Sequence, residues 1–421
     1  MRIIFLNPNT YLEDLIHPPI GIALLATICA QRGWETTVYD LPILGWNDER
    51  AVEEIVNFAP DFLGITTTTK TYAGSVEVAK LVKKEIPEVN IVMGGPHPTF
   101  AGWDVLTRCP YVDFTVAYEG EHTFPQLIEA CRAGMFPQEI PGVGYRSNDR
   151  IILTPPASPI KELDDLPMPR REFFPIMDYL ARDDETTVLT ARGCPNRCAF
   201  CSTSRMGRSL RCRSPQKVLE EVEYLLEMGF CSIFFSDDTF TSSLSRVENL
   251  CNVFKNIKRS WRWTCNMRLQ DAKSDILGHM SEAGCYRVFV GVESSSKNIL
   301  GKVNKLCPTS DAVELCKLIQ SYDIEVHASF LLGLPGETEE TIIETLEHAK
   351  RMQPDMISFN VITPYPGTEL YNHPEKYGLV MPNKFWFENK RWFDLPVCGT
   401  EAISPERLKQ LATETYLNYL T

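Results

Sequence analysis

Three cysteines within one short stretch are the most chemically suggestive feature of this chain. Cys194, Cys198 and Cys201 lie in ARGCPNRCAFC with the spacing C-x3-C-x2-C. Thiolates are preferred ligands of zinc and of iron–sulfur clusters. Structural zinc usually takes four protein ligands, and no complementary pair of His or Cys lies near this trio. The spacing therefore favours a four-iron cluster with one iron open to a substrate, and zinc is the weaker alternative.

Polar residues and glycines follow several later segments whose apolar runs predict strands. The chemistry of a barrel gathers at the carboxyl ends of its strands, and these residues lie at such ends. These residues are Asp237 and Asp238 at the end of 231–238, Arg268 at the end of 262–268, Glu293 and Ser294 at the end of 286–294, and Leu332 and Gly333 at the end of 325–333.

The chain from residue 185 onward alternates strand patterns with helical ones. Six βα units predict a partial (β/α)6 barrel over residues 185–375. The expected strands are 185–191, 231–238, 262–268, 286–294, 325–333 and 356–364, and the expected helices are 215–228, 244–257, 271–283, 309–322 and 338–352.

Residues 1–135 show the same alternation with other segments. We expect an α/β fold here, a Rossmann-like doubly wound parallel sheet. Residues 136–184 are rich in Pro and acidic residues and predict a linker. Residues 376–421 predict a short C-terminal helical or cap region, in which FWFENKRWF (385–393) would lie near the barrel mouth. The expected N-terminal strands are 2–7, 35–41, 61–69, 90–98 and 113–121, and the helices are 21–34, 49–59, 73–87 and 123–134.

Charge and composition narrow the functional class. The 421 residues carry a net charge of -13, which argues against a general nucleic-acid binder. The 14 cysteines are scattered through ordinary helix and strand patterns, which favours a reducing cytoplasm over a disulfide scaffold. No apolar run reaches about 18 residues, so no membrane span is expected.

The cysteine motif after a first barrel strand, with Phe200 before its last cysteine, resembles that of the radical S-adenosylmethionine (SAM) superfamily. This resemblance implies that the three thiolates hold a [4Fe-4S] cluster whose open iron binds SAM. VFVGVESSS (288–296) and FLLGLPGETEE (330–340) resemble the fourth- and fifth-strand motifs of that family. The implied SAM contacts are Asp237, Asp238, Arg268, Glu293, Ser294, Leu332 and Gly333. A helix cap at 237–238 and a salt bridge at Arg268 are the structural alternatives.

The N-terminal half resembles the cobalamin-binding domain of one large radical SAM class. The segments on which this resemblance rests are HPPIGIALLA, GITTTT, VMGGPHPT and YEGE. Together with the barrel, the resemblance spans roughly residues 1–375. The motif D-x-H-x-x-G is missing, which implies base-off cobalamin with no histidine on cobalt. Lys70 or Tyr72 would lie under the lower face of cobalt as the catalytic candidates, although Lys70 also fits a solvated loop. The implied binding residues are Thr66, Thr67, Thr68, Gly94, Gly95 and Glu119.

The resemblance implies C-methylation of an unactivated sp3 carbon through a 5′-deoxyadenosyl radical and methylcobalamin, with a reductant such as ferredoxin or flavodoxin. Short members of the class favour a peptide or protein side chain as substrate, for example the methylated glutamine of methyl-coenzyme M reductase. The alternative is a lipid or natural product, either methylated or joined into a ring. Methylthiolation would need a second trio of cysteines, and Cys29, Cys109 and Cys131 are too dispersed.

Overall fold

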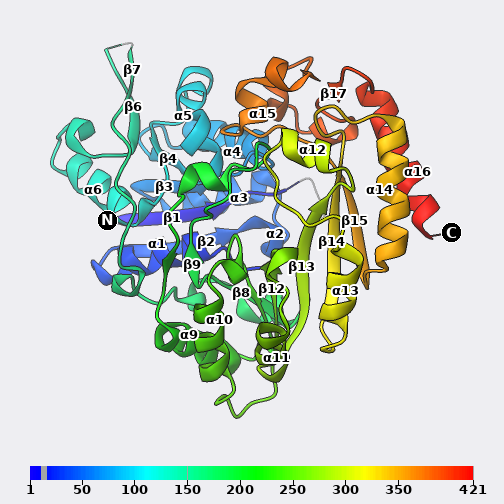
Figure 1. The fold of residues 1–421 in the computed structure, drawn as a ribbon. Helices are drawn as coiled ribbons and strands as arrows, with labels where there is room; N and C mark the ends of the chain where they lie inside the picture. Colours follow the sequence, from blue (N-terminus) through cyan, green and yellow to red (C-terminus); the bar gives the residue numbers. More distant parts are fainter. Residues whose placement is uncertain (11–16, 149, 421) are drawn as a thin grey trace. The chain divides into compact units, whose positions relative to one another are not determined.

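The structure, a computed structural model, describes residues 1–10, 17–148 and 150–420 (Figure 1). These residues form two compact units. The first is Met1–Asp184 with Phe387–Arg391, and the second is Glu185–Trp386 with Trp392–Thr421. Residues 387–391 were expected in a C-terminal cap, but they pack in the first unit. Residues 11–16, just before the HPPIGIALLA segment, lie outside the described residues.

The first unit is built on a seven-stranded sheet in the order β2-β1-β3-β4-β5-β6-β7. The first five of its strands in the chain run parallel, and β6 and β7 add an antiparallel hairpin after β5. The predicted doubly wound sheet is confirmed, whereas the hairpin lies in the segment that was expected to be a linker. The strands are β1 Arg2–Asn7, β2 Glu35–Asp40, β3 Phe62–Thr66, β4 Asn90–Gly94, β5 Phe114–Val116, β6 Val143–Ser147 and β7 Arg150–Leu153.

Helices pack on both faces of this sheet, with α1 against α6 and α3 against α4. Strand β4 ends earlier than the predicted 90–98, because Gly95 turns the backbone at φ +99° and Pro96 begins α5. Proline suits the first turn of a helix, where its missing N–H has no partner to lose. The helices are α1 Ile20–Gln31, α2 Leu41–Leu44, α3 Asp48–Phe58, α4 Tyr72–Glu85, α5 Pro96–Arg108, α6 Gly120–Arg132 and α7 Ile176–Leu180.

The second unit holds a six-stranded parallel sheet in the sequential order β8-β11-β12-β13-β14-β15. Sequential parallel strands with intervening helices give the predicted partial (β/α)6 barrel, which is confirmed (Figure 1). The strands are β8 Glu185–Val188, β11 Ser232–Phe235, β12 Arg262–Met267, β13 Cys285–Glu293, β14 Glu325–Leu332 and β15 Met356–Val361. Its main helices are α9 Pro215–Glu227, α10 Leu244–Phe254, α11 Ser274–Glu282, α12 Lys297–Lys302, α13 Ala312–Gln320 and α14 Glu339–Met352.

The last helix, α16 (Pro405–Leu420), packs against α14 and β15. Its Leu408 and Leu411 join a buried cluster with Leu332 and Ile342. The helix therefore covers the outside of the sheet at β14 and β15. The remaining short elements are β9 Ala191–Arg192, α8 Thr203–Met206, β10 Arg211–Cys212, α15 Glu369–Asn372, β16 Leu379–Val380 and β17 Gly399–Thr400.

A search of the described residues for a membrane-spanning helix finds no candidate that combines sufficient length with sufficient apolar character.

Candidate active site

The cysteine loop follows β8 at the carboxyl end of the sheet and is fixed at both ends. The short pair β9–β10 aligns Ala191 with Cys212, and the Cys194 N–H donates to the Gly207 carbonyl at 3.1 Å. Gly193 has φ +99°, and a Cβ there would lie 2.3 Å from the Ser209 carbonyl oxygen. Only glycine fits such a position without moving backbone. The fold thus presents the three thiols from a constrained loop.

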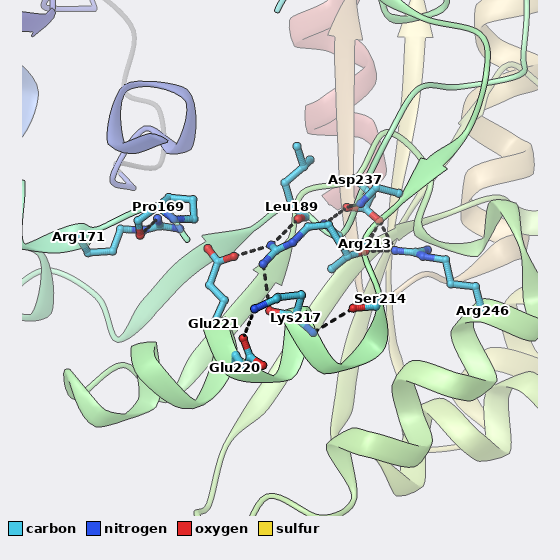
Figure 2. A network of polar contacts seen from close by, with 12 residues as sticks. Pro169, Arg171, Leu189, Arg213, Ser214, Lys217, Glu220, Glu221, Asp237 and Arg246 are labelled. Atoms are coloured by element: carbon cyan, nitrogen blue, oxygen red, sulfur yellow. Dashed lines mark hydrogen bonds and ion pairs between the residues drawn. The ribbon is translucent and has the colours of Figure 1, made fainter. Parts of the chain in front are cut away.

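Asp237, which follows β11, is hydrogen-bonded to residues of three other segments of the barrel (Figure 2). Its carboxylate accepts from the Thr190 N–H at 2.6 Å, the Thr190 hydroxyl at 2.5 Å and the Ala191 N–H at 3.0 Å. Arg246 donates to the same carboxylate at 2.9 Å. The Asp237 carbonyl also accepts from the side chain of Asn266 at 2.9 Å. Asp237 was expected to contact SAM, but its buried carboxylate is used to hold the base of the cysteine loop.

A second polar cluster in the same view anchors the start of α9. Arg213 bonds the carboxylate of the buried Glu221 and donates to the Leu189 carbonyl at 3.0 Å (Figure 2). Ser214 caps the helix by accepting from the Lys217 N–H. These contacts hold α9 against the end of β8, just before the cysteine loop begins.

A cavity of about 550 Å³ opens at the carboxyl end of the barrel. Several of the predicted site residues line it together, whereas Asp237, Ser294, Leu332 and Gly333 are not among its lining. The predicted residues in its wall are Cys194, Cys198, Cys201, Asp238, Arg268 and Glu293.

The three thiols suit an iron–sulfur cluster. Burial raises the pKa of Cys198 to about 11, with Cys201 and Cys194 adding to the shift and Lys305 opposing it. Metal binding is what makes such thiols thiolates. The Asn196 amide points at Cys194 Sγ at 3.5 Å. Among the described residues, no three His, Cys, Asp or Glu side chains converge tightly enough for one ion, but each thiolate of a cluster binds a different iron.

Glu293 also lines the cavity, and its backbone conformation is strained. Its φ is +68°, and the pairing of β13 with β14 shifts register between Gly291 and Glu293. Non-glycine residues adopt such φ values mainly where function or packing demands it. Its carboxylate pairs with Lys305 at 3.1 Å, and both side chains are largely buried. Burial raises the pKa of Glu293, while the Lys305 ammonium counteracts this shift.

Arg268 lines the cavity and also forms the salt bridge that the sequence left open as an alternative. Its Nε and Nη2 donate to the two carboxylate oxygens of Asp271 at 2.7 and 2.9 Å. Asp238 turns toward the cavity, and burial followed by the nearby Asp237 raises its pKa to about 6. The two adjacent aspartates therefore have different surroundings.

The turn after β14 is held from within the protein. Leu332 packs into the outer cluster, and Gly333 has φ +85° with Leu408 2.6 Å from the position of a Cβ. Glu337 Oε2 accepts from the N–H groups of Gly333 and Leu334 at 2.6 and 3.1 Å. Burial raises the pKa of Glu337 to about 7. Ser294 is buried, with its hydroxyl 3.4 Å from that of Thr345. The polar groups of this turn are therefore engaged within the protein, and neither Leu332 nor Gly333 lines the cavity.

The predicted residues of the first unit lie at the ends of β3, β4 and β5. Thr67 is buried, with its hydroxyl 3.2 Å from that of Ser75, whereas Thr68 is exposed. Thr66 and Gly94 pair in register, and a Cβ on Gly95 would lie 3.0 Å from the Thr67 carbonyl oxygen. Glu119 accepts from the Ile160 N–H at 2.7 Å. The hydroxyl of Thr67 and the turn at Gly95 serve internal packing of this edge.

Tyr72 is the first residue of α4, and its side chain is buried. Its ring lies 4.2 Å from that of His97 and 5.4 Å from that of Phe387. Burial raises the pKa of Tyr72 and lowers the pKa of His97 to about 3. Lys70, two residues earlier, is half-buried. The Tyr72 ring is thus part of an aromatic cluster that includes a segment from far along the chain.

Three residues in the barrel were not foreseen from the sequence. Lys305 pairs with Glu293, Asn266 ties the cavity wall to Asp237, and His327 lines the cavity from β14. Each is a single polar residue outside any motif. Period-two alternation along 325–332 was the available signal for His327, because it places this side chain on the inner face with Ser329.

Comparisons with known proteins agree with this geometry. Residues 14–128 match the model of the B12 binding domain, and residues 188–349 match that of the radical SAM superfamily. An uncharacterised methyltransferase from Pyrococcus horikoshii is 31% identical over 411 residues, covering 96% of this chain and 87% of that protein. An anaerobic magnesium-protoporphyrin IX monomethyl ester cyclase from Cereibacter sphaeroides is 28% identical over 387 residues. The match covers 88% of this chain and 63% of that protein.

A solved structure shows the same fold. The radical SAM methyltransferase TsrM from Kitasatospora setae, with cobalamin and a [4Fe-4S] cluster bound, matches with a TM-score of 0.84 at 19% identity over 99% of this chain and 88% of that one. The fold and the cysteine-lined cavity define a radical SAM enzyme with a B12-binding domain. The chain belongs to the cobalamin-dependent radical SAM methyltransferase family. The predicted family and fold are confirmed, and cobalamin, SAM and a [4Fe-4S] cluster are its cofactors.

Proposed function

We propose that this protein C-methylates an unactivated sp3 carbon. The observation that carries the proposal is the barrel cavity, which the three cysteines line together with Arg268 and Glu293. A cluster and SAM would be held together there, in a chain that also has a B12-binding domain. Methylation at a carbon without nucleophilic character is a reaction for which both cofactors are needed.

When bound, the cluster and SAM would supply a 5′-deoxyadenosyl radical after one-electron reduction, and cobalamin would supply a methyl group taken from a second SAM. Overall, the substrate C–H becomes C–CH3. Two SAM molecules are converted to methionine, 5′-deoxyadenosine and S-adenosylhomocysteine. The two electrons required come from a reductant of the ferredoxin or flavodoxin class, as expected from the sequence.

The chain contributes binding and orientation. Cys194, Cys198 and Cys201 hold the cluster. Glu293, which is paired with Lys305, would accept from the amino group of SAM, and Arg268, which is held by Asp271, would donate to its carboxylate. The cavity thus has a carboxylate for the ammonium group of SAM and a guanidinium for its carboxylate group.

Cobalamin binds base-off in this proposal, with no histidine on cobalt. His97 follows the Gly94–Gly95 pair, but it is buried, neutral and packed between Tyr72 and Phe387. Its ring is therefore unsuited to coordinate cobalt. The exposed Thr68 is a candidate contact for the cofactor tail, and Lys70 remains the candidate for the lower face.

We propose a peptide or protein side chain as substrate, with the glutamine of methyl-coenzyme M reductase as the specific candidate. Among the described residues, none beyond Ser358 lines the cavity, and α16 packs outside the sheet. The described part of the C-terminal region therefore does not line the cavity. A cavity that this region does not line suits a large substrate. The likeness to a cyclase keeps a ring-forming reaction on a small molecule as the second candidate.

The test is product analysis with anaerobically reconstituted enzyme, methyl-labelled SAM and candidate peptides. The proposal predicts a labelled peptide with 5′-deoxyadenosine and S-adenosylhomocysteine formed together. The Cys198→Ala variant, which lacks one cluster ligand, serves as the inactive control. Formation of 5′-deoxyadenosine and a modified substrate without S-adenosylhomocysteine would instead support the ring-forming candidate.

A further inference from the structure

Lys305 follows α12, and the end of this helix is bonded to the cysteine loop. The Ala199 N–H donates to the Val303 carbonyl at 2.8 Å, and both residues belong to one buried apolar cluster. The carbonyl carbon of Cys198 is one bond from the Ala199 nitrogen, so it lies within about 4 Å of the Val303 oxygen. Lys305 comes two residues after Val303 and lines the same cavity as Cys198. The two segments are therefore fixed against each other.

The turn after α12 has the hydrogen bonds of a Schellman motif. The Lys305 N–H donates to the Leu300 carbonyl at 3.0 Å, and the Asn304 N–H donates to the Gly301 carbonyl at 3.2 Å. Asn304 adopts the left-handed conformation at φ +54°, which asparagine tolerates better than most residues. The helix end itself therefore holds the backbone of Lys305 in place.

The Lys305 ammonium forms a buried ion pair in the cavity. Its Nζ lies 3.1 Å from Glu293 Oε1, and the two side chains are 19% and 9% exposed. Water and salt screen buried charges much less than exposed ones. Each member of this pair can therefore act on groups beyond its direct partner.

The two charges of the pair act unequally on Cys198. Burial raises the pKa of Cys198, and the Lys305 ammonium opposes this shift with a larger effect than that of Cys201, Cys194 or Glu293, which add to it in that order. For Lys305, burial lowers the pKa, but Glu293 and then Cys198 outweigh it. Lys305 is thus the member of the pair that acts more strongly on this cluster ligand.

We propose that Lys305 positions a positive charge beside Cys198 and thereby raises the reduction potential of the cluster that the three cysteines hold. Reduction moves one electron from a reductant of the ferredoxin or flavodoxin class onto the cluster, with no bond made or broken. The added negative charge is stabilised by a nearby cation, because the charge around an iron–sulfur cluster helps to set its potential. The inference rests on the cluster of the family and does not depend on the methylated substrate.

The test measures the midpoint potential of the cluster in the anaerobically reconstituted protein without SAM, with electron paramagnetic resonance reporting the reduced form. Lys305→Met removes the positive charge and should shift the potential to a more negative value. Glu293→Gln removes the opposing charge and should shift it to a more positive value by a smaller amount, since Glu293 acts less strongly on Cys198. The double variant should lie between Lys305→Met and the wild type.

Two further lysine variants serve as controls. Lys302 lies in the same helix, but it is exposed and outside the cavity lining. Because water screens its charge, Lys302→Met should leave the potential unchanged. Lys305→Arg keeps the positive charge and should stay close to the wild type.

The proposal would be overturned if Lys305→Met had the potential of the wild type, or if Lys305→Met and Glu293→Gln shifted it in the same direction. Iron content is measured on every variant. If Lys305→Met retains less iron than the wild type, Glu293→Gln decides alone, and an unchanged or more negative potential in that variant overturns the proposal.

The role of Lys305 and the proposed function can fail separately. Opposite shifts in the two variants, with no S-adenosylhomocysteine formed from SAM, would keep the role of Lys305 and reject methyl transfer. Formation of S-adenosylhomocysteine and 5′-deoxyadenosine, with a potential that does not depend on Lys305, would reject that role and keep methyl transfer.

Discussion

Replacing Gly291 by alanine should disable SAM binding while leaving the barrel folded. A Cβ at this position would lie 2.3 Å from Glu293 Oε1 and 3.0 Å from Lys305 Nζ. Both contacts are with the ends of flexible side chains, and the Gly291 backbone needs no positive φ. The strand can therefore stay in place, but the Glu293 carboxylate must retreat by at least 0.7 Å to reach even a 3.0 Å contact.

That retreat removes the carboxylate from the position where it would meet the amino group of SAM. A hydrogen bond to a charged group contributes about 1.5–3 kcal/mol. Its loss corresponds to a SAM affinity about 10- to 100-fold weaker, at about 1.4 kcal/mol per tenfold. The assay is a SAM titration of the reduced cluster followed by electron paramagnetic resonance. Iron content should stay at the wild-type level, because the cysteine loop is not touched.

Gly301→Ala is the control, since no atom lies within 4 Å of the added Cβ and the residue sits in the nearby α12. Its SAM affinity should equal that of the wild type. The assignment of Glu293 would be refuted if Gly291→Ala bound SAM as tightly as the wild type. It would also be refuted if the variant lost its iron, because the damage would then lie at the cysteine loop.

Three further predictions test neighbouring parts of the site. Burial raises the pKa of Glu337 from 4.5 in the unfolded chain to about 7 in the folded protein. Between these two pH values the folded state keeps a proton that the unfolded state has lost, so the free energy of unfolding falls as pH rises from about 4.5 to 7. The fall is about 3 kcal/mol at about 1.36 kcal/mol per unit, and urea unfolding at several pH values should show it in the wild type but not in Glu337→Gln. Gly193→Ala would place a Cβ 2.3 Å from the Ser209 carbonyl oxygen, and iron analysis after reconstitution should show loss of most of the cluster. Asp237→Asn leaves Arg246 buried without its partner charge, which should cost about 3–5 kcal/mol and broaden the cluster resonance; an unchanged melting temperature and spectrum would contradict this role.

Strand order and the cysteine loop were accessible from the sequence because their signals are local. Buried apolar runs separated by helical patterns define β1 to β5 and the six barrel strands, and C-x3-C-x2-C is contiguous. The hairpin β6–β7 was missed because it depends on pairing with β5, which no local pattern encodes. Residues 387–391 were misplaced for a similar reason. Phe387 packs on Tyr72 and His97, more than 280 residues away in the chain.

The adjacent aspartates show where sequence reasoning ends at the site. Successive side chains at a strand end point to opposite sides, so Asp237 and Asp238 could not both face the cavity. Asp237 is turned away from the cavity by its hydrogen bonds with Thr190 and Arg246, which are tertiary contacts. In the same way, the salt bridge of Arg268 with Asp271 and its place in the cavity wall are compatible, although the sequence presented them as alternatives.

The most direct test of methyl transfer needs no substrate. The reconstituted holoenzyme is reduced anaerobically with SAM that carries a deuterated methyl group, and the cobalamin is then extracted and analysed by mass spectrometry. The account predicts deuterated methylcobalamin together with an equal amount of S-adenosylhomocysteine. Cobalamin that stays unlabelled while SAM is converted only to 5′-deoxyadenosine and methionine would contradict it.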